Sequence, residues 1–144
     1  MIIGSLKLFE KRVIGPTDNP LLIRYIIFRL PSFGIFLHKL CRSDHERALH
    51  DHPWPFNTLI LRTGYTEVTD HGERFLAPGT WVHRPATWKH RVVIHDKPAW
   101  TLVFLGPRIR KWGFWPDGKW CWWRKYDDTK GICSEEILWQ GNDD

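Results

Sequence analysis

Short apolar segments separated by turn-forming residues constrain the fold of this chain more than any other feature. The segments are rich in Val, Ile, Leu, Phe, Trp and Thr, and many of these residue types favour strands over helices. Pro-Gly, Pro-Ala and Asp-Lys-Pro sequences stand between them and break any longer element. The strands expected in this part of the chain are 57–63, 65–68, 74–77, 80–84, 91–95 and 101–105. Many short strands with almost no helix predict an all-β sandwich or barrel.

Both ends of the chain carry further turn signals. Segments 22–30 and 35–41 flank a Pro-Ser-Phe-Gly turn and are expected to form a hairpin. Segments 112–115 and 119–124 flank Pro-Asp-Gly, a tight-turn sequence. One helix is expected, over 134–139, because its first residue is a serine that can cap it and two glutamates follow in the first turn.

Length and composition narrow the class of protein. A chain of 144 residues without repeats or a linker is expected to form one domain over 1–144. No apolar run approaches the ~20 residues of a membrane span, and the first residues lack the pattern of a signal peptide. Cys41, Cys121 and Cys133 form no CxxC pair, which predicts reduced thiols in a cytoplasmic protein. The net charge of +5 is common among enzymes and argues little for nucleic acid.

Two histidines stand one residue apart ahead of an apolar strand. Side chains alternate along an extended segment, so His50 and His52 are expected on one side and Asp51 on the other. Two imidazoles side by side form a natural chelate for Fe, Mn, Ni, Cu or Zn. A third ligand from another strand would complete such a site. The candidates are His83, His90 and His95.

The spacing of this pair resembles the first motif of the cupin family. That motif runs glycine, five residues, HxH, three or four residues, glutamate, six residues, glycine. Here His50-x-His52 is followed after four residues by Asn57 and after six more by Gly64. Asparagine therefore stands at the glutamate position, and the position of the leading glycine is Asp44.

A second stretch is similar to the second cupin motif, which runs glycine, five residues, PxGxxHxxxN. Gly79 is followed after five residues by Pro-Ala-Thr-Trp-Lys-His at 85–90. Thr87 stands for the inner glycine and Ile94 for the final asparagine. The resemblance places motif 1 at about 45–64 and motif 2 at about 79–94. It implies a cupin-type double-stranded β-helix, the jelly-roll barrel, with little helix.

The resemblance also implies a metal site and its ligands. His50, His52 and His90 would bind one divalent ion, with Fe expected first and Zn, Mn or Ni as alternatives. An amide is a poor ligand compared with a carboxylate, so Asn57 is expected to form hydrogen bonds beside the site rather than bind the ion. Some cupin oxygenases bind their metal through three histidines without a glutamate, and this chain resembles that type.

Other side chains are expected around the site. Strand alternation places Trp81 with His83 on one face, where His83 would act as a catalytic acid or base if that face is inward; a half-exposed structural histidine is the alternative. His95 is expected at the surface. The residues expected to line the substrate pocket are Trp54, Trp81, Arg84 and Trp88. Arg84 or Arg24 is a candidate to bind an anionic substrate. No role is expected for His38, His45 or His71, which fall in polar or turn contexts.

Segment 108–125 interleaves six basic residues with five tryptophans. Aromatic faces with positive charge can bind single-stranded nucleic acid or stack on sugars. The favoured interpretation is a terminal hairpin whose tryptophans pack over the barrel, with lysine and arginine stems covering them. Nucleic acid and membrane are therefore not expected partners.

These observations predict a small-molecule oxygenase with a three-histidine divalent metal centre, such as an Fe(II)-dependent dioxygenase. A ligand-binding cupin without catalysis and a metal-assisted sugar isomerase or epimerase are the alternatives. The expected partner is a small anionic substrate. Homodimers through exposed sheet edges are also expected, with the N-terminal hairpin as a candidate edge.

Overall fold

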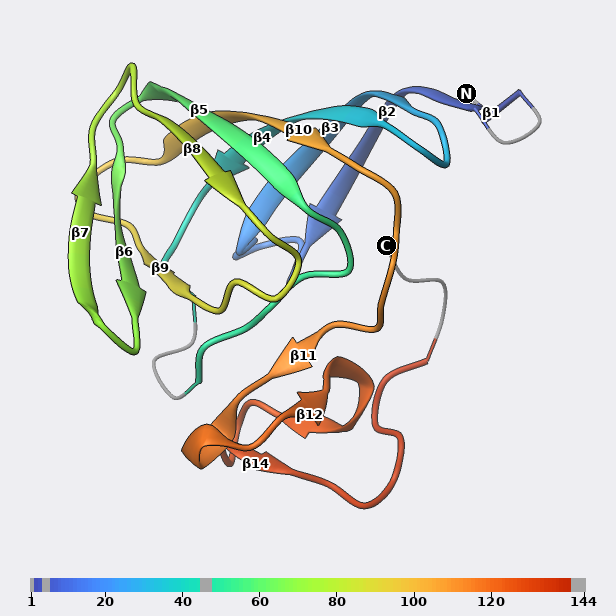
Figure 1. Cartoon of the computed structure of the whole chain (residues 1–144), viewed down its shortest axis with the longest axis vertical. Coiled ribbons are helices and arrows are strands. Elements are labelled where there is room, and N and C mark those ends of the chain that lie inside the picture. Colours follow the sequence, from blue (N-terminus) through green and yellow to red (C-terminus); the bar gives the residue numbers. More distant parts are fainter. Residues whose placement is uncertain (1, 4–5, 45–47, 141–144) are drawn as a thin grey trace.

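The computed structural model describes residues 2–3, 6–44 and 48–140, and it is built almost entirely of antiparallel strands. One sheet has seven strands: β1 (Ile2–Ile3), β2 (Leu6–Ile14), β3 (Leu22–Arg29), β4 (Gly34–Leu40), β10 (Ala99–Leu105), β5 (Phe56–Arg62) and β8 (Trp81–Arg84), in that spatial order. A second sheet holds β7 (Gly72–Leu76), β6 (Tyr65–Thr69) and β9 (Arg91–Val93). Figure 1 shows this smaller sheet beside the larger one. The all-β prediction is therefore confirmed.

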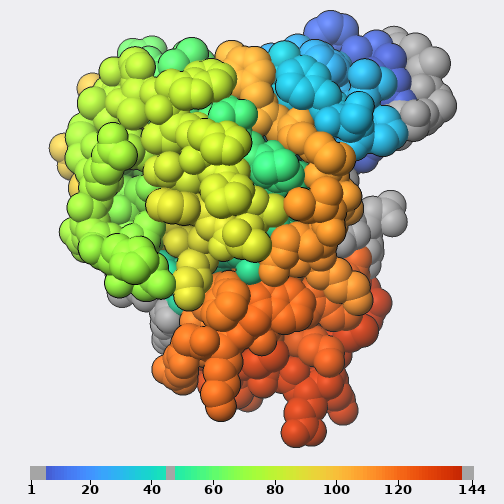
Figure 2. All heavy atoms as spheres, viewed as in Figure 1, coloured from blue at the N-terminus to red at the C-terminus, as the bar shows by residue number. Residues whose placement is uncertain are grey.

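The C-terminal segment forms short elements of its own. They are β11 (Gly113–Phe114), η1 (Pro116–Gly118), β12 (Cys121–Trp122), η2 (Trp123–Lys125), β13 (Tyr126–Asp127) and β14 (Ile132–Cys133). β11 pairs with β12 and β13 with β14. This segment, orange to red, lies below the two sheets in Figure 1 and packs against their lower side in Figure 2.

Strand alternation determines which side chains face the interior. Along β10, Ala99, Thr101, Val103 and Leu105 are buried, while the residues between them are partly exposed. β5 follows the same rule from Phe56 to Ile60. Burying each large apolar side chain stabilises the fold by roughly 1.5–3 kcal/mol. The buried faces of these strands form one wall of the interior.

The expected hairpin of segments 22–30 and 35–41 is confirmed, because β3 and β4 pair in antiparallel register. Strand β2 was not predicted, although it pairs with β3 along most of its length. Many β2 residues are only half-buried, and Phe9 is 80% exposed with a positive φ of 49°. The strand therefore lacks the apolar alternation by which the others were predicted.

Two expectations for the C-terminal segment are wrong. Residues 134–139 form no helix: the backbone N–H groups of Leu138 and Trp139 donate to the Arg124 carbonyl instead of to carbonyls one turn earlier. The thiols are not all reduced either, because Cys121 and Cys133 form a disulfide. Cys121 lies on β12 and Cys133 on β14, and their separation of twelve residues in the sequence could not show that they pair.

Three tryptophans of this segment are covered by cations. Lys89 lies over Trp115, Lys111 over Trp122 and Arg124 over the Trp123 ring. Such contacts are worth roughly 0.5–1 kcal/mol each at exposed sites. Within the described residues, no helix is long and apolar enough to cross a membrane.

Candidate metal centre

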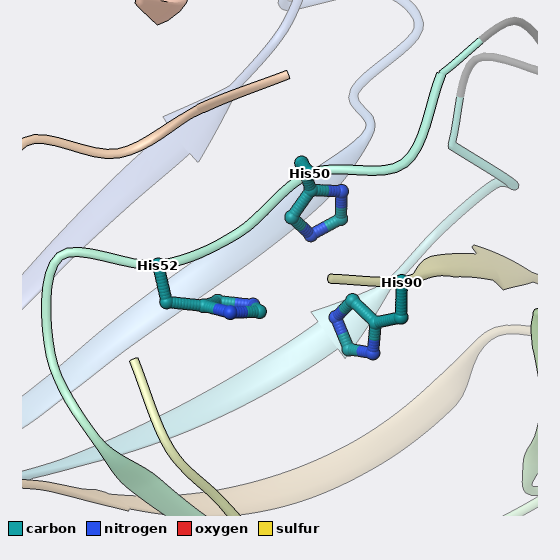
Figure 3. Close-up of side chains that lie close together, drawn as sticks. All are labelled: His50, His52 and His90. Carbon is teal, nitrogen blue, oxygen red and sulfur yellow. The ribbon is translucent and has the colours of Figure 1, made fainter. Parts of the chain in front are cut away.

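Three histidine side chains converge between the two sheets and the C-terminal segment. One ring nitrogen from each of His50, His52 and His90 lies within 4.8 Å of the other two. The ring centroids are 4.9–5.2 Å apart, and Figure 3 shows the rings pointing toward one another. The structure thus brings together the three residues that the motifs singled out.

Backbone hydrogen bonds hold the segments that carry these rings. The His50 N–H donates to the His90 carbonyl at 2.8 Å, and the His90 N–H donates back at 3.0 Å. The His52 N–H donates to the Ala86 carbonyl at 3.0 Å. Segment 50–52 is therefore paired with 86–90, and alternation then directs both of its imidazoles inward.

The outer nitrogen of each ring is next to an acceptor. The Nδ1–H of His52 donates to the Trp88 carbonyl at 3.0 Å, and that of His90 donates to a Glu67 carboxylate oxygen at 2.6 Å. His50 Nδ1 lies 3.6 Å from an Asp44 carboxylate oxygen. An acceptor at Nδ1 keeps the proton there and leaves the Nε2 lone pair free. His52 and His90 can therefore present Nε2 to a cation, and one ring nitrogen of His50 lies beside them.

Burial keeps two of these rings neutral. Desolvation lowers the pKa of His50 to about 4, against the opposing effect of Asp44. Desolvation, followed by the charges of His90 and His50, holds the pKa of His52 well below its usual range. Neutral imidazole is the form that binds metals, so the site is ready for a cation at neutral pH.

Glu67 is the functional residue that the motif analysis missed. Its side chain is almost fully buried on β6 and accepts hydrogen bonds from His90, from Arg84 at 2.6 Å and from the Trp88 indole at 3.1 Å. Burial would raise the pKa of Glu67, but the hydrogen bonds from His90 and Arg84 lower it to about 2. The signal that could have found it is its place two residues after Tyr65, on the inward face of an alternating strand.

The structure places Asn57 and His83 away from the three histidines, which corrects two expectations. Both residues face outward from neighbouring strands, where the Asn57 carbonyl oxygen and His83 Nδ1 lie 2.8 Å apart at an exposed position. The reason is register: Phe56 and Thr58 are the buried residues of β5 at this level, so position 57 points the other way. His83 is therefore no pocket residue.

Of the four residues expected in the pocket, one lines the cavity and three do not. Trp54 lines the cavity beside the histidines, but Trp81 shares the outer face of His83 and is 54% exposed. Arg84 and Trp88 lie behind His90, where the guanidinium is 4.1 Å from the indole ring and pairs with Glu67. Arg84 is thus committed to an ion pair and is not open to a substrate.

The remaining histidines fall in different environments. His95 is exposed and bonded to Thr66, as expected for a surface residue, and His71 is exposed near Asp70. His45 lies outside the described residues. His38, for which no role was expected, lines the interior beside Arg24.

A cavity of about 720 Å³ opens onto the three histidines. Its walls come from the inward faces of both sheets and include Phe36, Phe56, Tyr65 and Leu105. The C-terminal segment contributes Trp139. The volume lies in the range of small-molecule binding sites, and the walls are mostly apolar, so a small organic molecule fits this space.

Several solved structures of other proteins have a fold similar to that of this chain. A sugar phosphate isomerase of the cupin superfamily from Silicibacter pomeroyi DSS-3 matches with a TM-score of 0.56 and 23% identity, over 76% of this chain and 80% of that one. The DMSP lyase DddQ from Ruegeria pomeroyi DSS-3 matches with a TM-score of 0.56 and 19% identity, over 70% of this chain and 57% of that one. HppE in its Fe(II) form matches with a TM-score of 0.54 and 11% identity, over 67% and 56%.

These likenesses show that the chain has the cupin fold, as the spacing of its histidines predicted. No protein-family model matches the sequence, and no curated protein sequence matches it. The chain spans little more than half of DddQ and of HppE. Because the matching proteins carry different chemistries on one fold, the reaction must be argued from the site itself.

Proposed function

We propose that this protein is a metal-dependent enzyme that oxidises a small molecule with O₂, with Fe(II) as its metal. The observation that carries the proposal is the set of three convergent imidazoles, each with an acceptor at Nδ1. Imidazole nitrogen is a donor that suits Fe, Zn, Cu and Ni. The residues present therefore fit a divalent transition metal, and the Fe(II) form of HppE, a protein of the same fold, supports iron.

The composition of the ligand set favours catalysis over a structural role. Among the described residues, no carboxylate and no cysteine joins the three histidines as a fourth ligand. Structural zinc sites are normally closed by four protein ligands, whereas catalytic sites keep open positions. Fe(II) held here would supply open coordination positions for a substrate and for O₂.

The surrounding residues have distinct parts in this proposal. Glu67 and the Trp88 carbonyl fix two of the rings through Nδ1, while Phe36 and Phe56 keep bulk water from the site. Burial, followed by the charge of Glu67, raises the pKa of Tyr65. Its phenol therefore keeps its proton at neutral pH and can donate a hydrogen bond to a bound molecule.

A metal-assisted isomerase is the second candidate, and the similarity to a sugar phosphate isomerase favours it. The outward position of His83 removes the general base that was expected for that reaction. A non-catalytic binding protein remains the third candidate. Both alternatives predict a ligand-binding cavity without metal-dependent use of oxygen.

The test is oxygen uptake by metal-loaded protein. Protein loaded anaerobically with Fe(II) is mixed with pooled small carboxylates and thiols, air is admitted, and oxygen is followed with an electrode. We expect uptake that depends on Fe(II), is lost in His52→Ala and persists in the surface control His95→Ala. Ligand binding without uptake under Fe(II), Mn(II) or Ni(II) would replace the oxygenase with a binding protein or an isomerase.

A further inference from the structure

Arg24 and His38 form a polar pair in the cavity outside both motifs. They face each other across β3 and β4, and the Arg24 Nε–H donates to His38 Nε2 at 3.0 Å. Both line the cavity that contains the three histidines. The guanidinium carbon lies 4.8 Å from the centre of the Phe36 ring, which supports one of its faces. The arginine is thus held in place by a hydrogen bond and by an aromatic ring.

The Arg24 guanidinium has no counter-ion among the described residues. Within the described part of the chain, no carboxylate lies at ion-pair distance from it, whereas the other arginine considered for substrate binding, Arg84, is paired with Glu67. Burial, followed by the charge of Arg12, lowers the pKa of Arg24 to about 10. It is therefore still a cation at neutral pH. A cation that is partly withdrawn from water and has no partner is costly, and an anion entering the cavity would offset that cost.

The hydrogen bond to His38 uses only the Nε–H of Arg24, so its terminal NH₂ groups are available to a ligand. Its Nε–H is taken by His38, while its two terminal NH₂ groups have no bond to any described residue. Burial, followed by the charge of Arg24, holds the pKa of His38 well below its usual range, so its Nε2 is available as an acceptor. Two adjacent N–H donors of a guanidinium match the two oxygens of a carboxylate.

From this geometry we infer that Arg24, positioned by His38, binds the carboxylate of a small organic acid whose other end reaches the three histidines. That this organic acid is a substrate rests on the proposed function. A single guanidinium balances a singly charged carboxylate better than a doubly charged phosphate. The apolar walls around the pair suit a hydrocarbon or aromatic body for that acid.

Binding to metal-free protein tests this inference without relying on turnover. Titration calorimetry after EDTA treatment compares hexanoate and benzoate with hexanamide, benzamide and inorganic phosphate. We expect the acids to bind at least about tenfold more tightly than their amides, and Arg24→Met to remove that preference. Arg62→Met, on the exposed end of β5, is the matched control and should retain it.

Variants of His38 separate positioning from general damage. His38→Gln keeps an acceptor for the Arg24 Nε–H and should preserve most of the preference for acids, while His38→Leu should lose it. Absorption of bound Co(II) should be the same in all these variants, because none is a metal ligand. Arg24→Lys, which keeps the charge but not the paired donors, should bind the acids with intermediate affinity.

Three outcomes would overturn the inference: equal affinity of wild-type protein for acids and amides, unchanged acid binding in Arg24→Met, or tighter binding of phosphate than of the acids. The first and third need no variant, so they hold even if Arg24→Met does not fold. Acid binding through Arg24 without oxygen uptake would keep this inference and overturn the oxygenase. Oxygen uptake without a preference for acids would keep the oxygenase and overturn this inference.

Discussion

At the scale of single residues, Glu67 joins the candidate metal centre to the rest of the interior. Its carboxylate accepts from His90, Arg84 and the Trp88 indole at once. It therefore orients one imidazole and neutralises one buried arginine, although it is not among the convergent donors. Carboxylates behind metal-binding histidines typically account for 10–100-fold in metal affinity.

Glu67→Gln should weaken metal binding by roughly 10–100-fold, because an amide fixes the His90 ring less firmly. It should also lower the free energy of unfolding by about 3–5 kcal/mol, since Arg84 loses its buried counter-charge. Co(II) titration and urea denaturation measure the two effects. Glu73→Gln, at an exposed position of β7, is the control and should change neither. Full metal affinity in Glu67→Gln would show that the His90 ring is fixed by other contacts.

Asn57 gives a second test at this scale. If the glutamate position of the first motif faced the metal, Asn57→Glu would add a ligand and tighten binding. The structure directs that side chain outward to His83, so we expect metal affinity within a factor of about two of the parent. The same Co(II) titration decides, and a marked gain in affinity would mean that this part of β5 is shifted by one residue.

At the scale of elements, alternation in the sequence predicted which segments are strands but not always which face is buried. Along β8, both Trp81 with His83 and Val82 with Arg84 are plausible inward pairs by composition. Which pair is buried depends on Glu67, seventeen residues away on another sheet. Its carboxylate pairs with Arg84 and so offsets the cost of burying that guanidinium. Likewise the partners of Asp51 and the disulfide are long-range contacts, which no local pattern shows.

The side chains on the two sides of segment 50–52 have different partners. The imidazoles of His50 and His52 point to the centre, while the buried Asp51 carboxylate accepts from the Gly113 N–H at 2.7 Å and the Trp115 indole at 3.0 Å. Arg110 adds an ion pair at 3.0 Å. One carboxylate thus attaches the C-terminal segment to the segment that carries two of the three histidines.

Asp51→Ala should release that attachment. We expect a loss of about 2–4 kcal/mol in unfolding free energy, because buried donors and a cation lose their acceptor. Amide exchange over 110–123 should accelerate more than exchange over β3 and β4. Mass spectrometry of exchanged peptides measures this, with the exposed Asp96→Asn as control. Uniform acceleration over the whole chain would instead indicate global destabilisation without a local anchor.

At the scale of the whole molecule, three partly buried histidines make stability depend on pH. Burial, the first cause in each case, lowers the pKa of His38, His50 and His52, that of His50 to about 4. Below pH ~6.5 the unfolded chain takes up protons on these rings, while the folded protein does not. Stability is therefore fully present above that pH and falls as the solution becomes more acidic.

The metal-free protein should lose roughly 1–2 kcal/mol for each of these three histidines between pH 7 and pH 5. Urea denaturation at intervals of half a pH unit measures the slope. His38→Gln removes one such ring outside the metal centre and should flatten the slope by about a third. A slope unchanged by this variant would assign the pH dependence to other groups.

The cupin fold and the three convergent histidines could be predicted because both depend on local spacing and strand alternation. The roles of Glu67 and His38 could not be predicted, because each depends on a contact between strands: Glu67 accepts from His90, and His38 accepts from Arg24, which the sequence had offered only as one of two candidate arginines. Homodimer formation and the absence of nucleic-acid binding stay predictions.

The two-sided segment 50–52 also has a thermodynamic consequence. A cation that fixes His50 and His52 orders the same backbone that presents Asp51 to Gly113 and Trp115. Docking of the C-terminal segment, in turn, restricts that backbone before a cation arrives. By linkage, each event must favour the other by the same factor. Metal binding should therefore increase the fraction of molecules in which the C-terminal segment is docked over the cavity. Variants that weaken docking should weaken metal binding by the same factor.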